Sequence, residues 1–304
     1  MKSLCRMRSI PLLLAMSLVV LMAVPALSMG AQAPVDLGTA SSFGVLAGTT
    51  ITNTGPTTVG GNAGGDIGVS PGSAFSDLGT LTLGGASHLG DAVALQAQAD
   101  LTAAYLDAAG RTPVTTITSE LGGATLKPGV YVSETGPFEI TGTLTLDAEG
   151  DPNAVFIFKS ASTLITASGS NVSLLNGARP CSVFWQVTSS ATLGTGSNFV
   201  GHIFALQSID AQTGATIQGQ LLARNGAVTL DSNTITNMLC PIIPVPSPTP
   251  TATPSPTPGT SDTTSTVTGG ELPQTGSPWY NVLFAGVALA LIGAVGLKTR
   301  KTDE

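Results

Sequence analysis

Aromatic, charged and cysteine residues are all scarce in this sequence of 304 residues. Aromatic side chains make up 5% of it and charged side chains 10%, and it contains three cysteines. Eleven basic residues stand against 18 acidic ones, and a net charge of −7 argues against a nucleic-acid binder. Charge is scarcest from Ser160 to Cys240, where the charged residues are Arg179, Asp210, Arg224 and Asp231. A surface this neutral indicates a flat face with a specific task, although a Ser- and Thr-rich secreted β-domain would share it.

Residues that could support catalysis or bind a metal are also few. The two histidines, His88 and His202, have no second histidine or cysteine at metal-ligand spacing, and no Gly-x-Ser-x-Gly motif with plausible partners occurs. Asp147, Glu149 and Asp151 could form a Ca²⁺ site or a carboxylate pair, but the glycine and proline among them favour a turn. We therefore expect no enzyme activity, no cofactor and no metal.

What the sequence does contain is a repeat. Thr195–Phe199, Thr213–Ile217 and Asp231–Ile235 share one pattern, and each copy begins 18 residues after the one before. The segment Ser168–Val172 carries the same pattern 27 residues before Thr195, which corresponds to one step plus a nine-residue insertion. A fixed period with an aligned apolar position is typical of stacked repeats.

The residue types of the repeat are Thr, Val, Ser, Gly, Ala and Ile, which favour strands and tight corners over helices. Eighteen residues can supply three strands of about five residues with corners between them. The sequence therefore predicts an all-β-dominated fold built as a triangular β-solenoid, with coils stacked about 4.8 Å apart.

One segment differs from the strands around it. Residues 91–109 lack Gly and Pro, and apolar residues recur there at helical spacing. Asp91 can cap the start of a helix and Gly110 its end. We expect one long amphipathic helix packed against the side of the solenoid.

The amino terminus predicts export. Basic residues precede an apolar run, and small residues follow it, so that residues 1–33 read as a signal peptide cleaved after Ala33 or after Ala26. The main domain would then span residues 34–240. It keeps Cys181 and Cys240, which can form one disulfide in an oxidising compartment or remain two free thiols.

Residues from about Val35 to Asn237 resemble the microbial ice-binding-protein family of secreted antifreeze and ice-adhesion domains. The resemblance rests on short segments in order along the chain: Val45–Ala47, Ile51–Gly55, Gly68–Gly72, Pro128–Tyr131, Leu144–Asp147, Val155–Phe158, Val183–Val187 and Gly226–Asp231. It implies a discontinuous right-handed β-solenoid, in which early strands complete the stack of the late ones and one long helix lies alongside.

In some members of that family a Thr-Ala/Gly-x-Thr/Asn motif lies on the ice-facing surface, and the repeat carries this motif. The resemblance thus implies ice contact for Thr195, Asn198, Thr213, Thr216, Thr229 and Thr234. Threonine offers a methyl and a hydroxyl with restricted χ1, so little side-chain entropy is lost on docking. Residues three apart on a flat strand point to opposite faces, so Thr195 and Asn198 share a surface only where the chain bends between them. The alternative is that they are turn residues.

The carboxyl-terminal part reads as a surface anchor. Residues 241–271 form a Pro-, Thr- and Ser-rich stalk, and residues 279–297 an apolar segment expected to cross the membrane before a basic tail at 298–304. Between them, Leu272-Pro273-Gln274-Thr275-Gly276 resembles the L-P-x-T-G sorting signal of Gram-positive surface proteins. It implies cleavage after Thr275 by a sortase and linkage to the cell wall, the alternative being a permanent single-pass anchor.

Together these features predict a monomeric, extracellular, wall-anchored protein whose partners are ice, the sortase and peptidoglycan. The alternative is an adhesin of the same fold that holds a polysaccharide or a protein.

Overall fold

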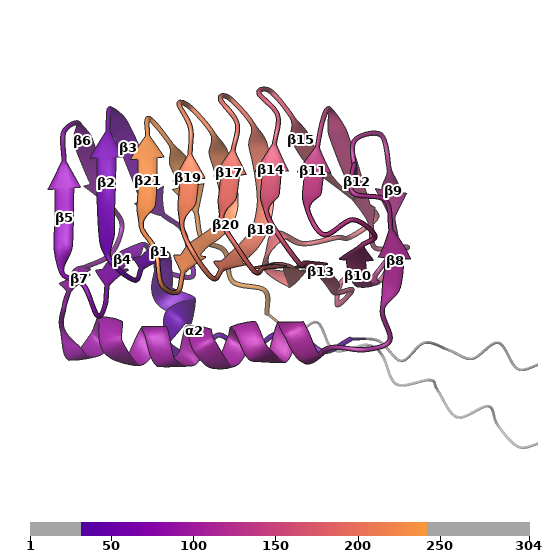
Figure 1. Ribbon diagram of the computed structural model, residues 1–304, viewed down its shortest axis with the longest axis horizontal. Coiled ribbons are helices and arrows are strands. Elements are labelled where there is room, and N and C mark those ends of the chain that lie inside the picture. The colour runs from indigo at the N-terminus through magenta and orange to yellow at the C-terminus, as the bar shows by residue number, and fades with distance from the viewer. Residues whose placement is uncertain (1–31, 242–304) are drawn as a thin grey trace, which may run out of the picture. The chain divides into compact units, whose positions relative to one another are not determined.

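The computed structural model describes residues 32–241, and nearly all of the predicted signal peptide and stalk, with the sorting motif, the membrane segment and the basic tail, lie outside them. The described chain is mostly parallel β-strands with one α-helix (Figure 1). The strands stack into a 15-stranded and a seven-stranded sheet. In each coil the chain passes through three positions in turn, so the stack has three faces, which we call face 1, face 2 and face 3.

Face 1 lies against the helix. Its strands, in stack order, are β8 (Thr115–Ile117), β10 (Gly129–Ser133), β13 (Phe156–Ser160), β16 (Val183–Val187), the second halves of β18 (Asn198–Ala205) and β20 (Thr216–Ala223), β1 (Phe43–Ala47), β4 (Asp66–Val69) and β7 (Ser87–Leu89).

Face 2 is the seven-stranded sheet. Its strands are β11 (Phe138–Ile140), β14 (Leu164–Thr166), β17 (Ala191–Leu193), β19 (Ile209–Ala211), β21 (Val228–Asp231), β2 (Thr50–Thr54) and β5 (Ala74–Asp77).

Face 3 completes each coil. Its strands are β9 (Thr125–Leu126), β12 (Thr143–Asp147), β15 (Asn171–Leu175), the first halves of β18 and β20, β22 (Thr234–Thr236), β3 (Pro56–Gly60) and β6 (Thr80–Leu83).

Faces 1 and 3 belong to one sheet because two long strands turn the corner between them. Gly201 and Gly219 lie side by side in the middle of β18 and β20, and both have positive φ. A Cβ atom on Gly219 would lie 2.0 Å from the carbonyl oxygen of Gly201. Glycine is therefore required here, both for its conformation and for the close approach of the two coils.

The order of the coils in space differs from their order in sequence. The coil of β1, β2 and β3, from the amino-terminal part, pairs directly with β20, β21 and β22, from the carboxyl-terminal part. The chain then returns along face 1 as α2 (Ala92–Gly110), which runs beside the stack from the β7 end to the β8 end (Figure 1). The side chain of Asp91 caps this helix by accepting a hydrogen bond from the backbone of Ala94 at 2.9 Å.

Two apolar clusters hold the fold together. The interior of the stack is filled by aliphatic side chains and by aromatic rings such as Trp185, which stacks on Phe158 with ring centroids 3.9 Å apart. The second cluster joins α2 to face 1 and includes Leu101, Leu222 and Phe204. At the helix end, Lys159 donates a hydrogen bond to the carbonyl of Arg111, a favourable position for a cation.

Two short 3₁₀ helices, η2 (Gly38–Ser42) and η3 (Pro180–Ser182), complete the described part. No helix between residues 32 and 241 is long and apolar enough to cross a membrane.

Candidate functional site

The repeated tetrapeptide forms the corner between face 2 and face 3. In Thr195–Asn198 the chain bends at Gly196, which has φ +65°, and Ser197 turns into the interior. Thr195 and Asn198 are consequently both exposed. Thr213–Thr216 repeats this geometry, with Gly214 at φ +72° and a fully buried Ala215. The bend that a shared surface requires is present in both copies.

The second exposed position of the motif continues along the stack as one row, which we call the hydroxyl row. Asn198 pairs with Thr216, and Thr216 with Thr234, as the 18-residue period predicts. The row extends in both directions, and its members are Thr143, Asn171, Asn198, Thr216, Thr234, Thr58 and Thr82. No member is charged, and neighbouring members are separated by about 4.8 Å, the distance between paired strands.

The first position of the motif forms a parallel row at the corner itself, which we call the corner row. Backbone hydrogen bonds between coils align Ser168, Thr195, Thr213, Asp231 and Thr54. Asp231 is the one charged member, and it is half-buried. Its carboxylate accepts hydrogen bonds from the hydroxyls of Thr213 and Ser232. The threonine pattern is therefore interrupted by a carboxylate whose two oxygens are both bonded to neighbours.

Hydrogen bonds between coils also hold a side chain in each of the two rows. Thr216 Oγ1 donates to Asn198 Oδ1 at 2.6 Å, and Thr195 Oγ1 lies 3.5 Å from Gln212 Oε1. A threonine hydroxyl that donates to a side chain of the neighbouring coil can still accept hydrogen bonds. The same bond restrains χ1 of that threonine in the free protein. The surface is thus an ordered array with little side-chain freedom left to lose.

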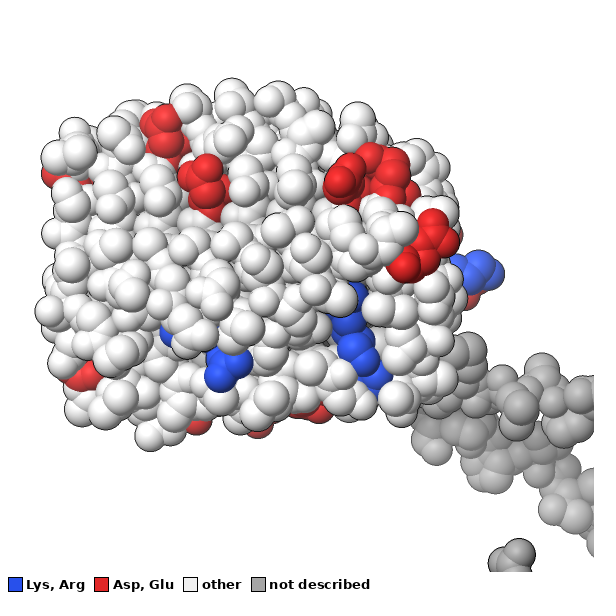
Figure 2. Space-filling view, viewed as in Figure 1, with Lys and Arg blue, Asp and Glu red and all other residues white. Residues whose placement is uncertain are grey.

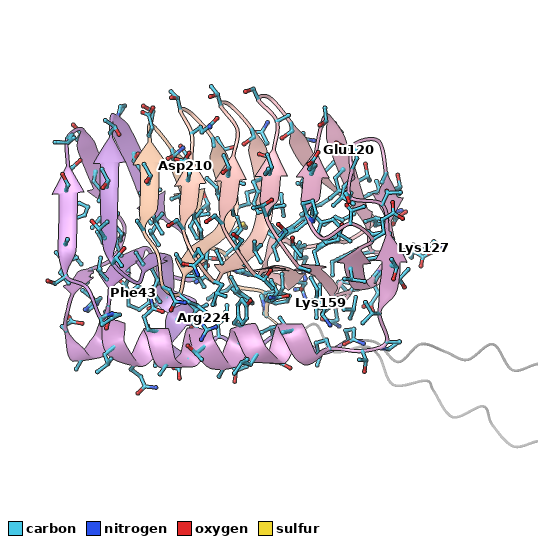
Figure 3. The ribbon with its side chains drawn as sticks, in the orientation of Figure 1. Phe43, Glu120, Lys127, Lys159, Asp210 and Arg224 are labelled. Carbon is cyan, nitrogen blue, oxygen red and sulfur yellow. A yellow bond between two sulfur atoms is a disulfide. The ribbon has the colours of Figure 1, made fainter. Side chains whose placement is uncertain are left out.

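Thr229 does not belong to this array. It lies on β21 in the middle of face 2, where it pairs with Asp210 on one side and Thr52 on the other. The corresponding outward positions of face 2 are Glu139, Ile165, Thr192, Asp210, Thr229, Thr52 and Ser76. Figure 2 shows this face with carboxylates scattered over it, and in Figure 3 Asp210 lies on β19, the middle strand, and Glu120 beside β11 at one end.

The remaining polar candidates form no common site. His88 bonds Asp91 at 2.8 Å beside the helix start. His202 is buried against Phe184, and burial lowers its pKa to about 4. In the loop after β12, Asp147 accepts hydrogen bonds from the backbone of Glu149 and from Asn176, both at 2.8 Å, which lowers its pKa.

Glu149 is paired with Lys127, and Asp151 binds the backbone of Asn153, so the carboxylates of this loop hold the loop itself. Within residues 32–241 there is no group of three or more His, Cys, Asp or Glu side chains that could hold a metal ion.

Sequence reasoning missed Thr58, Thr82 and Thr143, which the register adds to the hydroxyl row. All three are exposed and lie on strands with alternating burial. The alternation in Thr80-Leu81-Thr82-Leu83 and in Thr143-Leu144-Thr145-Leu146 was the available signal, because it marks a strand with one face outward.

Comparison with known proteins gives concordant results. Residues 45–236 match the family described as Ice-binding-like. The chain is 49% identical over 203 residues to an ice-binding protein of Nostoc sp. (strain HG1), covering 66% of this chain and 73% of that protein. It is 36% identical over 218 residues to an ice-binding protein of Colwellia sp., covering 66% and 83% of the two chains.

Among solved structures, an ice-binding protein from an Antarctic biological consortium superimposes with a TM-score of 0.64 at 45% identity. The match covers 68% of this chain and 92% of that one. The family match covers more than half of the sequence, and the fold of mostly parallel strands with one helix agrees with it. The chain therefore belongs to the ice-binding-like family.

Proposed function

We propose that this protein binds ice through the hydroxyl row and the corner row, on a right-handed triangular β-solenoid. The observation that carries the proposal is the register of face 3, which aligns seven Thr and Asn side chains, six exposed and Asn171 half-buried, without a charge among them. Ice presents ordered water and no net charge. A rigid, uncharged array of methyl and hydroxyl groups suits such a surface, because charged side chains would keep their own hydration shells.

The relatives support this proposal through what they are reported to bind. The proteins from Nostoc and Colwellia and the Antarctic consortium structure are all described as ice-binding proteins. The motif residues Thr195, Asn198, Thr213, Thr216 and Thr234 lie on one continuous surface here, whereas Thr229 lies on another. We accordingly assign the first five to ice contact and withdraw Thr229.

The test compares single tyrosine substitutions on three surfaces of a fragment spanning residues 34–241. Thr216→Tyr places a bulky ring in the hydroxyl row, Thr229→Tyr places it on face 2, and Thr188→Tyr places it at the exposed corner between faces 1 and 2. We expect Thr216→Tyr to lose most of its uptake into a slowly growing ice front, and the other two variants to retain it. Circular dichroism and thermal unfolding would verify that all three fold alike.

Two results would contradict the assignment. If Thr229→Tyr lost uptake and Thr216→Tyr did not, face 2 would be the contact surface. If the unsubstituted fragment were rejected by ice along with ordinary solutes, ice binding itself would be wrong. Thr213→Tyr extends the test to the corner row, where we also expect a loss.

We further propose that the domain is displayed on a Gram-positive cell wall. This rests on the order of the stalk, the motif Leu272-Pro273-Gln274-Thr275-Gly276, the apolar segment and the basic tail in the sequence. Display beside the cell suits ice adhesion better than protection of distant liquid. Replacing Thr275 by Ala should shift the protein from the cell-wall fraction to the membrane fraction. Unchanged release by a wall-digesting enzyme would argue against sortase linkage.

A further inference from the structure

The carboxyl-terminal strand is held in the stack by few pairs. Strand β22 has three residues and forms three register pairs with β20 and three with β3. It also holds Thr234, which links the two parts of the hydroxyl row. Removing β22 would separate Thr216 from Thr58 and open the junction between the carboxyl-terminal and amino-terminal coils on face 3, where the hydroxyl row lies.

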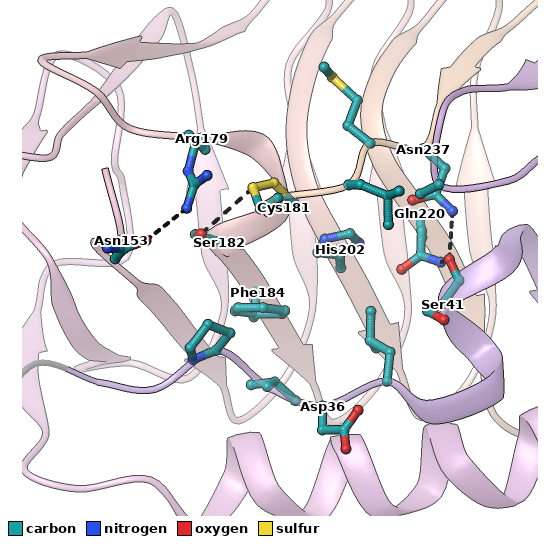
Figure 4. A pocket seen from close by; sticks show the side chains of 17 residues that line it. Asp36, Ser41, Asn153, Arg179, Cys181, Ser182, Phe184, His202, Gln220 and Asn237 are labelled. Atoms are coloured by element: carbon teal, nitrogen blue, oxygen red, sulfur yellow. Dashed lines mark hydrogen bonds between the residues drawn. A yellow bond between two sulfur atoms is a disulfide. The ribbon is translucent and has the colours of Figure 1, made fainter. Parts of the chain in front are cut away.

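The chain leaving β22 does not go straight into solvent. Asn237 is buried, and its side chain donates a hydrogen bond to the carbonyl of Ser41 at 2.8 Å. Leu239 is held through its backbone N–H, which donates to Asn62 Oδ1 at 2.8 Å. Cys240 then forms a disulfide with Cys181, with Cα atoms 5.7 Å apart (Figure 4).

Arg179 reinforces this attachment from the same short segment as Cys181. Its Nη1 donates to the carbonyl of Pro241 at 2.9 Å, and its Nη2 donates to Asn153 Oδ1 at 3.2 Å. The guanidinium therefore spans the departing chain and the loop before β13. Cys240 is thus fixed by a covalent bond and Pro241 by a cationic hydrogen bond, and both bonds come from residues 179–181.

The segment that receives this attachment leads into a central strand. Strand β16 begins directly after η3, and all five of its residues are buried. It forms five register pairs with β13 and four with β18. Pulling β16 out would open two sheet ladders and expose Trp185 and Phe184, a far larger loss than removing β22.

We propose that the Cys181–Cys240 disulfide and Arg179 form a clamp that diverts mechanical tension from β22 to β16. This inference rests on the proposed wall anchoring, because only a held carboxyl-terminal segment would pull on Pro241 when ice carries the domain away. The disulfide closes a loop whose ends are 59 residues apart and which contains Thr195, Asn198, Thr213, Thr216 and Thr234. Tension entering at Cys240 therefore passes through the disulfide to Cys181 and reaches β16 without first pulling on β22.

Single-molecule pulling tests the clamp without ice or cells. One handle is attached to the carboxyl-terminal end of the full chain and the other to an azide-bearing residue at position 188, the exposed corner after β16, so that the path from Cys181 to this handle runs through β16. The double variant Cys181→Ser/Cys240→Ser should show an early low-force step of at most about 3 nm, as β22 and the residues up to Pro241 straighten. The oxidised wild-type protein should lack this step and should first rupture at about twice the force, because rupture follows the kinetic barrier to opening.

Two further measurements separate the clamp from general stabilisation. Pulling between position 188 and an amino-terminal handle avoids Pro241, and there the first rupture should be the same in both proteins. Adding a thiol reductant to the wild-type protein already held in the instrument should make the early step appear. This measurement tests the clamp even if the double variant folds poorly. An early step in the oxidised protein, or its absence after reduction, would overturn the clamp. A failed cell-wall assay would instead refute only the anchoring.

Discussion

Faces 2 and 3 are made by the same coils and yet present different chemistry. Both consist of parallel strands in continuous register, so both are flat and regularly spaced. On face 3 the outward row contains only Thr and Asn, whereas the equivalent row of face 2 contains Glu139, Ile165 and Asp210. The stacking supplies flatness to both faces. The residue at each outward position then decides what a face can bind.

The largest effect should come from making face 3 resemble face 2. Thr216→Asp would place a carboxylate in the centre of the hydroxyl row and remove the donor to Asn198. A hydrated charge in the middle of the array should abolish most ice uptake, because docking would have to desolvate it. The matched change on face 2, Thr229→Asp, should leave uptake nearly unchanged. Equal losses in the two variants, measured with equal thermal stability, would show that the faces are not functionally distinct.

The part of face 3 formed by consecutive coils could be predicted from the sequence. The period of 18 residues aligned Phe199, Ile217 and Ile235, and these residues are neighbours in the register and buried. The 27-residue offset likewise predicted the pairing of Asn171 with Asn198. Periodicity works here because each coil repeats the same path, so an equal number of residues returns the chain to the same face.

The remainder of the row could not be predicted from periodicity. The pairing of Thr234 with Thr58 joins segments 176 residues apart, and Thr82 follows Thr58 by a longer step than the 18-residue repeat. The resemblance to a discontinuous fold implied that such a junction exists, but not its register. Sequence reasoning also named Thr229 and Thr216 together as ice-contact candidates, because exposure alone does not tell which of two outward faces a threonine occupies.

The next prediction concerns the pH dependence of folding stability. It should depend on a buried residue of face 1 and not on the exposed rows of face 3. Burial lowers the pKa of His202 from 6.5 to about 4, so the folded protein binds fewer protons than the unfolded chain between these values. Stability is therefore fully present above pH 6.5 and is lost as the pH falls toward 4, by up to about 3 kcal/mol. Ice uptake by the molecules that remain folded should not change over this range, since the hydroxyl row has no titrating group.

Urea unfolding at several pH values measures this loss, and His202→Gln provides the control. The variant should lose most of the pH dependence between 6.5 and 4, even if it is less stable at neutral pH. If the free energy of unfolding of His202→Gln still falls as steeply between pH 6.5 and 4, the pH dependence would have to come from carboxylates and not from His202.

The smallest effect should come from completing the corner row. Asp231 stands where Ser168, Thr195, Thr213 and Thr54 have hydroxyls, and Asp231→Thr would remove the one charge from this row. The change also removes the acceptor of the Thr213 and Ser232 hydroxyls, which costs some order. Because the carboxylate is half-buried and both its oxygens are bonded, its replacement should raise ice uptake only modestly.

Asp231→Asn separates the two contributions, since it removes the charge and keeps an acceptor for one of the two hydroxyls. If charge limits the corner row, both variants should exceed the wild-type protein in ice uptake. If hydrogen-bonded order matters more, Asp231→Asn should exceed Asp231→Thr. A gain from Asp210→Thr on face 2 with none from either Asp231 variant would reverse the comparison, because it would mean that face 2 carries the contact and that its carboxylates are what weaken it.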